Sequence, residues 1–94
     1  MNDASLMLER SVLGAIMGDN AQIARVSLTR KDFTVAAHGQ IFETVSRMIA
    51  AGKVADAVTV AELLEAETGR DWLRMVCDMV VECLVFSNAP AYAA

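Results

Sequence analysis

Residues 35–51 read VAAHGQIFETVSRMIAA and carry the clearest secondary-structure pattern in the chain. Apolar side chains return every three or four residues, the spacing that places them on one face of an α-helix. Gly52 follows directly and suits the end of a helix. The stretch predicts an amphipathic helix whose buried face is formed by Ala37, Ile41, Phe42, Val45, Met48 and Ile49.

The same helical spacing recurs outward from this stretch, and no segment alternates as a β-strand does. A chain of 94 residues has the size of one domain. We therefore expect an all-α fold, a single domain over residues 1–94 built as a compact orthogonal bundle of five or six short helices. The expected helices cover residues 5–17, a short stretch opened by Asp19 or Asn20, residues 35–51, residues 60–67, residues 72–86, and a last helix from Ser87 or Asn88.

Three residues between the helices have predicted structural roles. Phe33 is the one large apolar residue in the polar connection over residues 29–34, and we expect it to be a buried anchor. Thr59 and Glu62 have the spacing of a capping box. In that motif the threonine hydroxyl accepts the backbone N–H three residues on, and the glutamate carboxylate bonds back.

The predicted helix over residues 72–86 is apolar on most of its circumference. One stripe contains Leu73, Val76, Cys77, Val80, Val81 and Leu84. A second stripe beside it contains Trp72, Met75, Met79 and Cys83. Such a helix is either the central element of the bundle or also packs against a partner. We take the second stripe as the candidate interface and expect self-association into a dimer or higher oligomer.

The charge balance argues against a direct role in holding nucleic acid. The chain has 8 basic and 12 acidic residues, a formal net charge of −4. Proteins that bind phosphates cluster Lys and Arg on one face, whereas the densest basic pair here is Arg30 and Lys31. We expect no nucleic-acid binding by this chain alone.

The sequence predicts a cytoplasmic protein without membrane association. No apolar run reaches the roughly 18 residues of a membrane span. The N-terminus lacks the basic and long apolar regions of a signal peptide. Cys77 and Cys83 are six residues apart, which on one helix turns them away from each other. We expect two reduced, partly buried thiols.

No group of residues has the composition of a catalytic, cofactor or metal site. His38 is the only histidine and lies at the margin of the apolar face with Ile41 and Phe42. A hydrogen-bonded core histidine is the simpler interpretation, since catalysis or metal binding would need partners that the sequence lacks. Gly52-Lys53 lacks the other residues of a phosphate-binding loop. We expect neither enzyme activity nor a cofactor.

Several segments, taken in order, resemble the N-terminal domain of replicative DNA helicases of the DnaB family. Residues 9–17, ERSVLGAIM, look like the opening helix of that family. The resemblance extends from residue 9 to residue 93. The similar segments that follow are Asp32-Phe33, His38 with Ile41-Phe42-Glu43, residues 56–64 (DAVTVAELL), and Asn88 with Tyr92-Ala93.

The resemblance implies a small helical domain of the helicase collar. Such a domain takes part in hexamer assembly and contacts primase and loader proteins, while a separate RecA-like domain hydrolyses ATP. His38, Ile41 and Phe42 would be structural residues of the third helix. The alternative is a freestanding phage- or prophage-type protein of the same fold that binds helicase or primase as a regulator. A phosphate-binding loop encoded beyond Ala94 would separate the two hypotheses.

Overall fold

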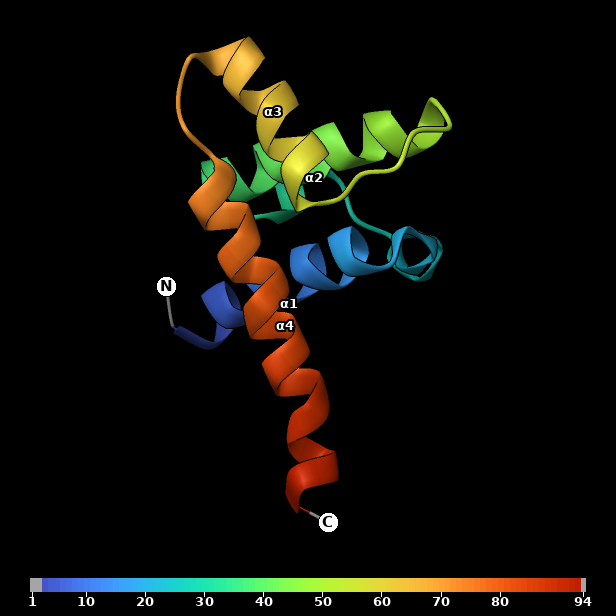
Figure 1. The fold of residues 1–94 in the computed structure, drawn as a ribbon, viewed down its shortest axis with the longest axis vertical. Coiled ribbons are helices and arrows are strands. Elements are labelled where there is room, and N and C mark those ends of the chain that lie inside the picture. The colour runs from blue at the N-terminus through green and yellow to red at the C-terminus, as the bar shows by residue number, and fades with distance from the viewer. Residues whose placement is uncertain (1–2, 94) are drawn as a thin grey trace.

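The computed structural model describes the backbone of residues 3–93 and the side chains of residues 6–85. Helices make up its regular structure, and no strand occurs in the described backbone. This confirms the predicted all-α fold. In chain order the elements are α1 (Asp3–Gly18), the 3-10 turns η1 (Asn20–Arg25) and η2 (Arg30–Asp32), α2 (Ala36–Ala50), α3 (Ala57–Thr68) and α4 (Leu73–Ala93) (Figure 1).

The helix expected over residues 35–51 is α2, and most of its predicted apolar face is buried. Ile41 and Val45 are fully enclosed. Phe42 packs on Phe33 from the preceding connection, with ring centroids 5.2 Å apart and planes tilted by 36°, an arrangement that aromatic pairs favour. The core continues into the other helices, and into the loops before α3 and α4, through Leu13, Ile16, Met17, Ala55, Val60, Ala61, Leu64, Trp72, Val76 and Met79.

α1 and α4 form the most extensive helix–helix contact of the fold and cross steeply (Figure 1). At the crossing, Gly14 of α1 lies against the backbone of α4. A Cβ atom added to Gly14 would lie 2.3 Å from the carbonyl oxygen of Met79. Only glycine lets the two backbones approach this closely. One turn earlier, Arg10 Nε donates to Glu82 Oε1 at 3.1 Å across the same two helices.

Asn20 joins the end of α1 to the loop before α3. Its side-chain amide donates to the carbonyl oxygens of Ile16 (2.8 Å) and Ala55 (2.9 Å), and its oxygen accepts the Ala55 N–H at 2.8 Å. Asp19 is the N-cap of η1 and accepts the Ala21 N–H. The prediction of a short helix opened by this pair is correct, although the helix is 3-10.

The predicted capping box of Thr59 and Glu62 is wrong. Asp56 is the N-cap of α3: its carboxylate accepts the Thr59 N–H at 2.8 Å, and the Thr59 hydroxyl accepts the Asp56 N–H at 3.0 Å. Aspartate caps a helix at least as well as threonine. The earlier cap lets Ala57 and Val58 join the helix, and it leaves Glu62 exposed inside α3.

The predicted helix end near residue 86, with a new helix from Ser87 or Asn88, is also wrong. The Asp71 carboxylate accepts the Leu73 N–H at 3.0 Å, and from there α4 continues unbroken to Ala93. No glycine follows Gly69 in the sequence, so α4 lacks the residue that most often ends a helix in the left-handed conformation. Its second half extends beyond the rest of the fold (Figure 1).

The α1–α4 crossing predicts opposite effects for two glycine substitutions. Gly14→Ala should lower the free energy of unfolding by about 1–3 kcal/mol, because the new methyl group overlaps the backbone of α4. Gly18→Ala should leave stability unchanged or raise it by about 0.5–1 kcal/mol. An added Cβ at Gly18 meets no atom within 4 Å. Urea unfolding of both variants measures the difference, and equal stabilities would contradict the close approach.

Candidate functional site

Among the residues whose side chains are described, Glu9 of α1 is the one acidic residue that is buried. Its carboxylate faces the N-terminal end of α2. Oε2 accepts both the Thr34 backbone N–H, at 3.0 Å, and the Thr34 hydroxyl. Oε1 accepts the Val35 N–H at 3.4 Å and lies 2.9 Å from His38 Nδ1. One carboxylate thus has three residues as hydrogen-bond partners at the start of α2: Thr34, Val35 and His38.

Two opposing effects set the pKa of Glu9. Burial raises the pKa, because the charged form loses water. The hydrogen bonds from the Thr34 hydroxyl, the Thr34 N–H, the His38 ring and the Val35 N–H outweigh burial and lower the pKa from 4.5 to about 2. Glu9 is therefore a fixed anion at neutral pH, placed where the first turn of α2 presents unpaired N–H groups.

The Glu9–His38 pair is arranged as a structural hydrogen bond in the interior of the fold. His38 is 5% exposed, and its Nδ1 atom is occupied by Glu9. Both Glu9 carboxylate oxygens accept hydrogen bonds from other residues of the chain. Neither oxygen is therefore free to act as a general base toward a nucleophile. Within the described residues no group of three or more His, Cys, Asp or Glu side chains could hold a metal ion. The Glu9–His38 pair therefore stabilises the fold.

The structure divides the four candidate interface residues between the core and the surface. Trp72 and Met79 are 2% and 0% exposed, so neither side chain is available to a partner. Trp72 Nε1 also donates to Thr68 Oγ1 at 2.8 Å. Met75 is exposed at the edge of the bundle, and Cys83 is half-buried beside Gly14. Of the four candidate interface residues, Trp72 and Met79 are therefore core residues, whereas Met75 and Cys83 keep exposed surface.

Each of the two predicted apolar stripes is divided between core and surface. In the stripe expected in the core, Val76 is fully buried and Val80 packs on the core, whereas Leu73, Val81 and Leu84 are exposed. In the stripe expected at the interface, Trp72 and Met79 are buried. Periodicity alone could not decide between neighbouring stripes, because both repeat every three or four residues. We call the exposed set the outer face of α4: Leu73, Cys77, Val81, Leu84 and Val85.

The outer face is unusually apolar for a surface. Leu73, Val81, Leu84 and Val85 are 45–60% exposed, and Cys77 lies between them, half-buried. Isolated surface aliphatics are ordinary, whereas a contiguous row of them marks an interaction site.

A groove borders the outer face where α4 passes the end of α1. It encloses about 380 Å³, and glycine and alanine form its floor because they have almost no side chain. Leu84 belongs both to the outer face and to the wall of the groove, so the two are continuous. We call this hollow the Gly14–Gly18 groove. The residues that line it are Gly14, Ala15, Gly18, Asp19, Gln22, Val80, Cys83 and Leu84.

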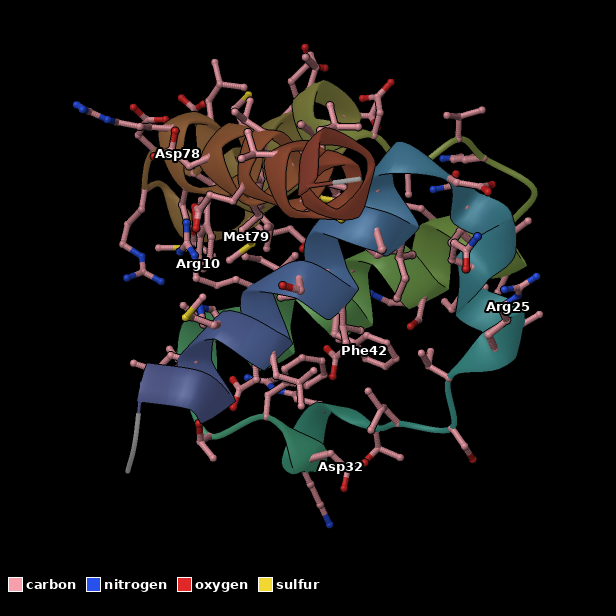
Figure 2. The ribbon with its side chains drawn as sticks, turned by 90° about the horizontal axis from the view of Figure 1, so that it is seen from below. Arg10, Arg25, Asp32, Phe42, Asp78 and Met79 are labelled. Carbon is pink, nitrogen blue, oxygen red and sulfur yellow. The ribbon has the colours of Figure 1, made fainter. Side chains whose placement is uncertain are left out.

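The acidic side chains of α4, Asp78 and Glu82, lie near Arg10 of α1. Figure 2 looks nearly along α4, with Met79 directed toward α1 and Asp78 on the same edge as Arg10. The Glu82 hydrogen bond and charge raise the pKa of Arg10, and the hydrogen bond from Arg10 lowers the pKa of Glu82. Arg74 is exposed and stands seven residues before Val81, so it shares the outer face with the aliphatic side chains.

Two further ion pairs lie away from α4. Arg30 Nη1 is 3.3 Å from Glu43 Oε2, and Arg47 Nη2 is 3.0 Å from Glu67 Oε1. All four side chains are well exposed, so each pair adds little to stability. No described helix is both long and apolar enough to cross a lipid bilayer.

Sequence reasoning missed the role of Glu9, although a pattern pointed to it. Glu9 lies on the same helical face as Leu13 and Ile16, and His38 lies on the buried side of α2. Two polar residues on facing apolar surfaces need each other as partners. The role of Gly14 depends on α4, about 65 residues later in the chain, and no local pattern predicts it.

The Glu9 carboxylate predicts a loss of stability in acid. Its pKa lies below the 4.5 of the unfolded chain. The stability it contributes is therefore complete above pH 4.5 and is lost as the pH falls toward about 2. Glu9→Ala should lower the free energy of unfolding by about 2–4 kcal/mol at pH 7, because buried N–H donors lose their acceptor.

Urea unfolding between pH 7 and pH 2 tests this assignment. The native chain should lose stability in the acid range, and Glu9→Ala should lose less of it. Glu65→Gln, on the exposed surface of α3, is the matched control and should behave as the native chain does. An acid dependence in Glu9→Ala as steep as that of the native chain would contradict the role given to Glu9.

A comparison against protein families identifies the family of this chain. The DnaB-like helicase N-terminal domain matches the chain over residues 1–94. The comparisons with curated proteins and with solved structures each give no match. The family match spans the full length of the sequence and confirms the resemblance carried by residues 9–17 and the segments after them. The chain therefore belongs to the family of DnaB-like helicase N-terminal domains.

Proposed function

We propose that this chain is the non-catalytic N-terminal assembly domain of a replicative DNA helicase. It takes part in DNA replication in the cytoplasm through protein contacts, both with itself and with primase or a helicase loader. The family match supports the helicase assignment. The observation that carries the contact function is the row of aliphatic side chains on the outer face of α4, which stays exposed in the single chain.

The chemistry of the described residues fits a protein that acts by contact. The titratable side chains are in ion pairs, in caps, or dispersed over the surface. The buried Glu9–His38 pair secures the start of α2. With a net charge of −4, the chain also lacks the concentrated positive charge that a phosphate backbone requires.

Binding measurements with purified replication proteins test the proposal. The chain is immobilised, and primase and helicase loader from the same cell are passed over it separately. We expect a dissociation constant on the order of 1–100 µM for at least one of them, as for transient contacts of modest area. Glu9→Ala, which weakens the fold, should bind less in proportion to its unfolded fraction.

Other outcomes decide against the assignment. If neither primase nor loader binds but the intact helicase does, the freestanding regulator of the same fold is the better description. If none of the three proteins binds, the contact function with replication proteins is wrong.

A further inference from the structure

The outer face of α4 carries one charged side chain among its aliphatic residues, the guanidinium of Arg74. Arg74 is exposed and lies about two helical turns before Val81 on the same side of α4. Other arginine residues of the fold are paired with glutamate side chains, whereas Arg74 forms no ion pair with a described side chain. A cation in this position is available to an acidic group of a partner.

The Gly14–Gly18 groove contains a charge of the opposite sign. Asp19 lines this groove together with Leu84, which also belongs to the outer face. The Asp19 carboxylate is exposed and accepts the Ala21 N–H at 3.2 Å, but no described cation pairs with it. Leu84 lies about 15 Å along α4 from Arg74. The outer face and the groove thus form one apolar strip with a cation toward one end and an anion toward the other.

We propose that this strip binds an amphipathic α-helix of a different protein. The apolar stripe of the partner helix lies on the outer face of α4. An acidic side chain of the partner pairs with Arg74, and a basic side chain enters the Gly14–Gly18 groove beside Asp19. This inference rests on the proposed function and deepens it, because it names the chemistry of the partner and the surface that receives it.

The dimensions of the strip match a single helix. From Leu73 to Val85 the outer face spans about 18 Å, or roughly three helical turns. That length is small beside an interface of roughly 800 Å² per partner between two folded domains. Helices that dock in grooves are recognised through three or four apolar side chains over two to three turns. The strip therefore offers one helix a complete contact.

The groove has the shape that a long basic side chain requires. Its floor is glycine and alanine, and a Cβ atom added to Gly18 meets no atom within 4 Å. The aliphatic part of a lysine or arginine can lie along this floor while its charged end reaches Asp19. An acidic side chain in the same place would face the Asp19 carboxylate and be repelled.

The charges of the strip distinguish its partners. An entirely apolar helix would leave Arg74 and Asp19 without partners at the contact, whereas a helix with one acid and one base would pair both. A nucleic acid would find a single cation where it needs several. A second copy of the chain also carries a net charge of −4 and is repelled by the first. A different protein with the complementary pattern meets none of these obstacles.

Fluorescence anisotropy with synthetic helical peptides of about 18 residues tests the proposal. All the peptides carry the same leucine stripe. The charge-pair peptide has one glutamate and one lysine roughly ten residues apart, the neutral peptide has glutamine at both positions, and the basic peptide has lysine at both. The native chain should bind the charge-pair peptide with a dissociation constant on the order of 10–100 µM and the neutral peptide about tenfold more weakly.

Arg74→Glu reverses the expected preference. This variant should bind the charge-pair peptide about tenfold more weakly than the native chain does, and it should bind the basic peptide more tightly than the native chain does. A variant that had merely lost its fold would bind no peptide. Lys53→Glu is the matched control: it makes the same change of charge on an exposed residue between α2 and α3, and its peptide preference should be unchanged.

Two further variants test the groove and the apolar row. Asp19→Asn removes the charge but keeps an oxygen that can accept the Ala21 N–H. It should weaken the charge-pair peptide by about three- to tenfold and leave the neutral peptide unchanged. Val81→Glu should weaken every peptide by about tenfold or more. Thermal unfolding shows that each variant is still folded.

Three outcomes overturn the proposal. In the first, the native chain binds the charge-pair and neutral peptides equally. In the second, Lys53→Glu changes the peptide preference as much as Arg74→Glu does. In the third, sedimentation shows a dimer of the chain that Val81→Glu dissociates and no peptide displaces, so that a second copy is the occupant.

The peptide measurements and the tests with primase and loader can fail separately. Peptide binding with the expected sensitivities, when neither primase nor loader binds, refutes the contacts with replication proteins and leaves the helix-binding strip in place. Primase or loader that binds Arg74→Glu and Val81→Glu as tightly as the native chain uses another surface. That result, together with equal binding of the charge-pair and neutral peptides, refutes the strip and leaves the proposed function in place.

Discussion

The position of α2 in this fold depends on the hydrogen bonds that the buried Glu9 carboxylate accepts. It accepts hydrogen bonds from Thr34 and Val35, where the chain enters α2, and from the ring of His38 in the first turn. These N–H groups have no partners within α2. An anion supplied from α1 fixes the position of α2, and with it the Phe33–Phe42 contact in the core.

The same stretch of α1 fixes the position of α4. Arg10 directly follows Glu9 and pairs with Glu82, and Gly14 admits the α4 backbone one turn later. Residues 9–14 thus contact two different helices through opposite sides of α1. This stretch of α1 is short because one residue suffices for each contact. The Glu9 anion binds α2, and Gly14, which has no side chain, lets α4 approach.

The sequence pattern predicted those features of the fold that depend on neighbouring residues in the chain. The amphipathic face of α2 was recognisable because its polar and apolar sides are distinct. The start of α3 was misplaced because Asp56 and Thr59 are both good caps, and the geometry selected the aspartate. The buried side of α4 could not be predicted from the two stripes, because the close contact with Gly14 of α1 decides which residues face inward.

The glycines of α1 connect stability with surface shape. Each glycine inside a helix costs roughly 0.5–1 kcal/mol relative to alanine. Gly14 offsets that cost through close packing, whereas Gly18 gains no packing and leaves a hollow. A substitution that strengthens α1 at Gly18 would therefore also begin to fill the surface beside α4. Gly18 therefore links the stability of α1 to the shape of the surface beside α4.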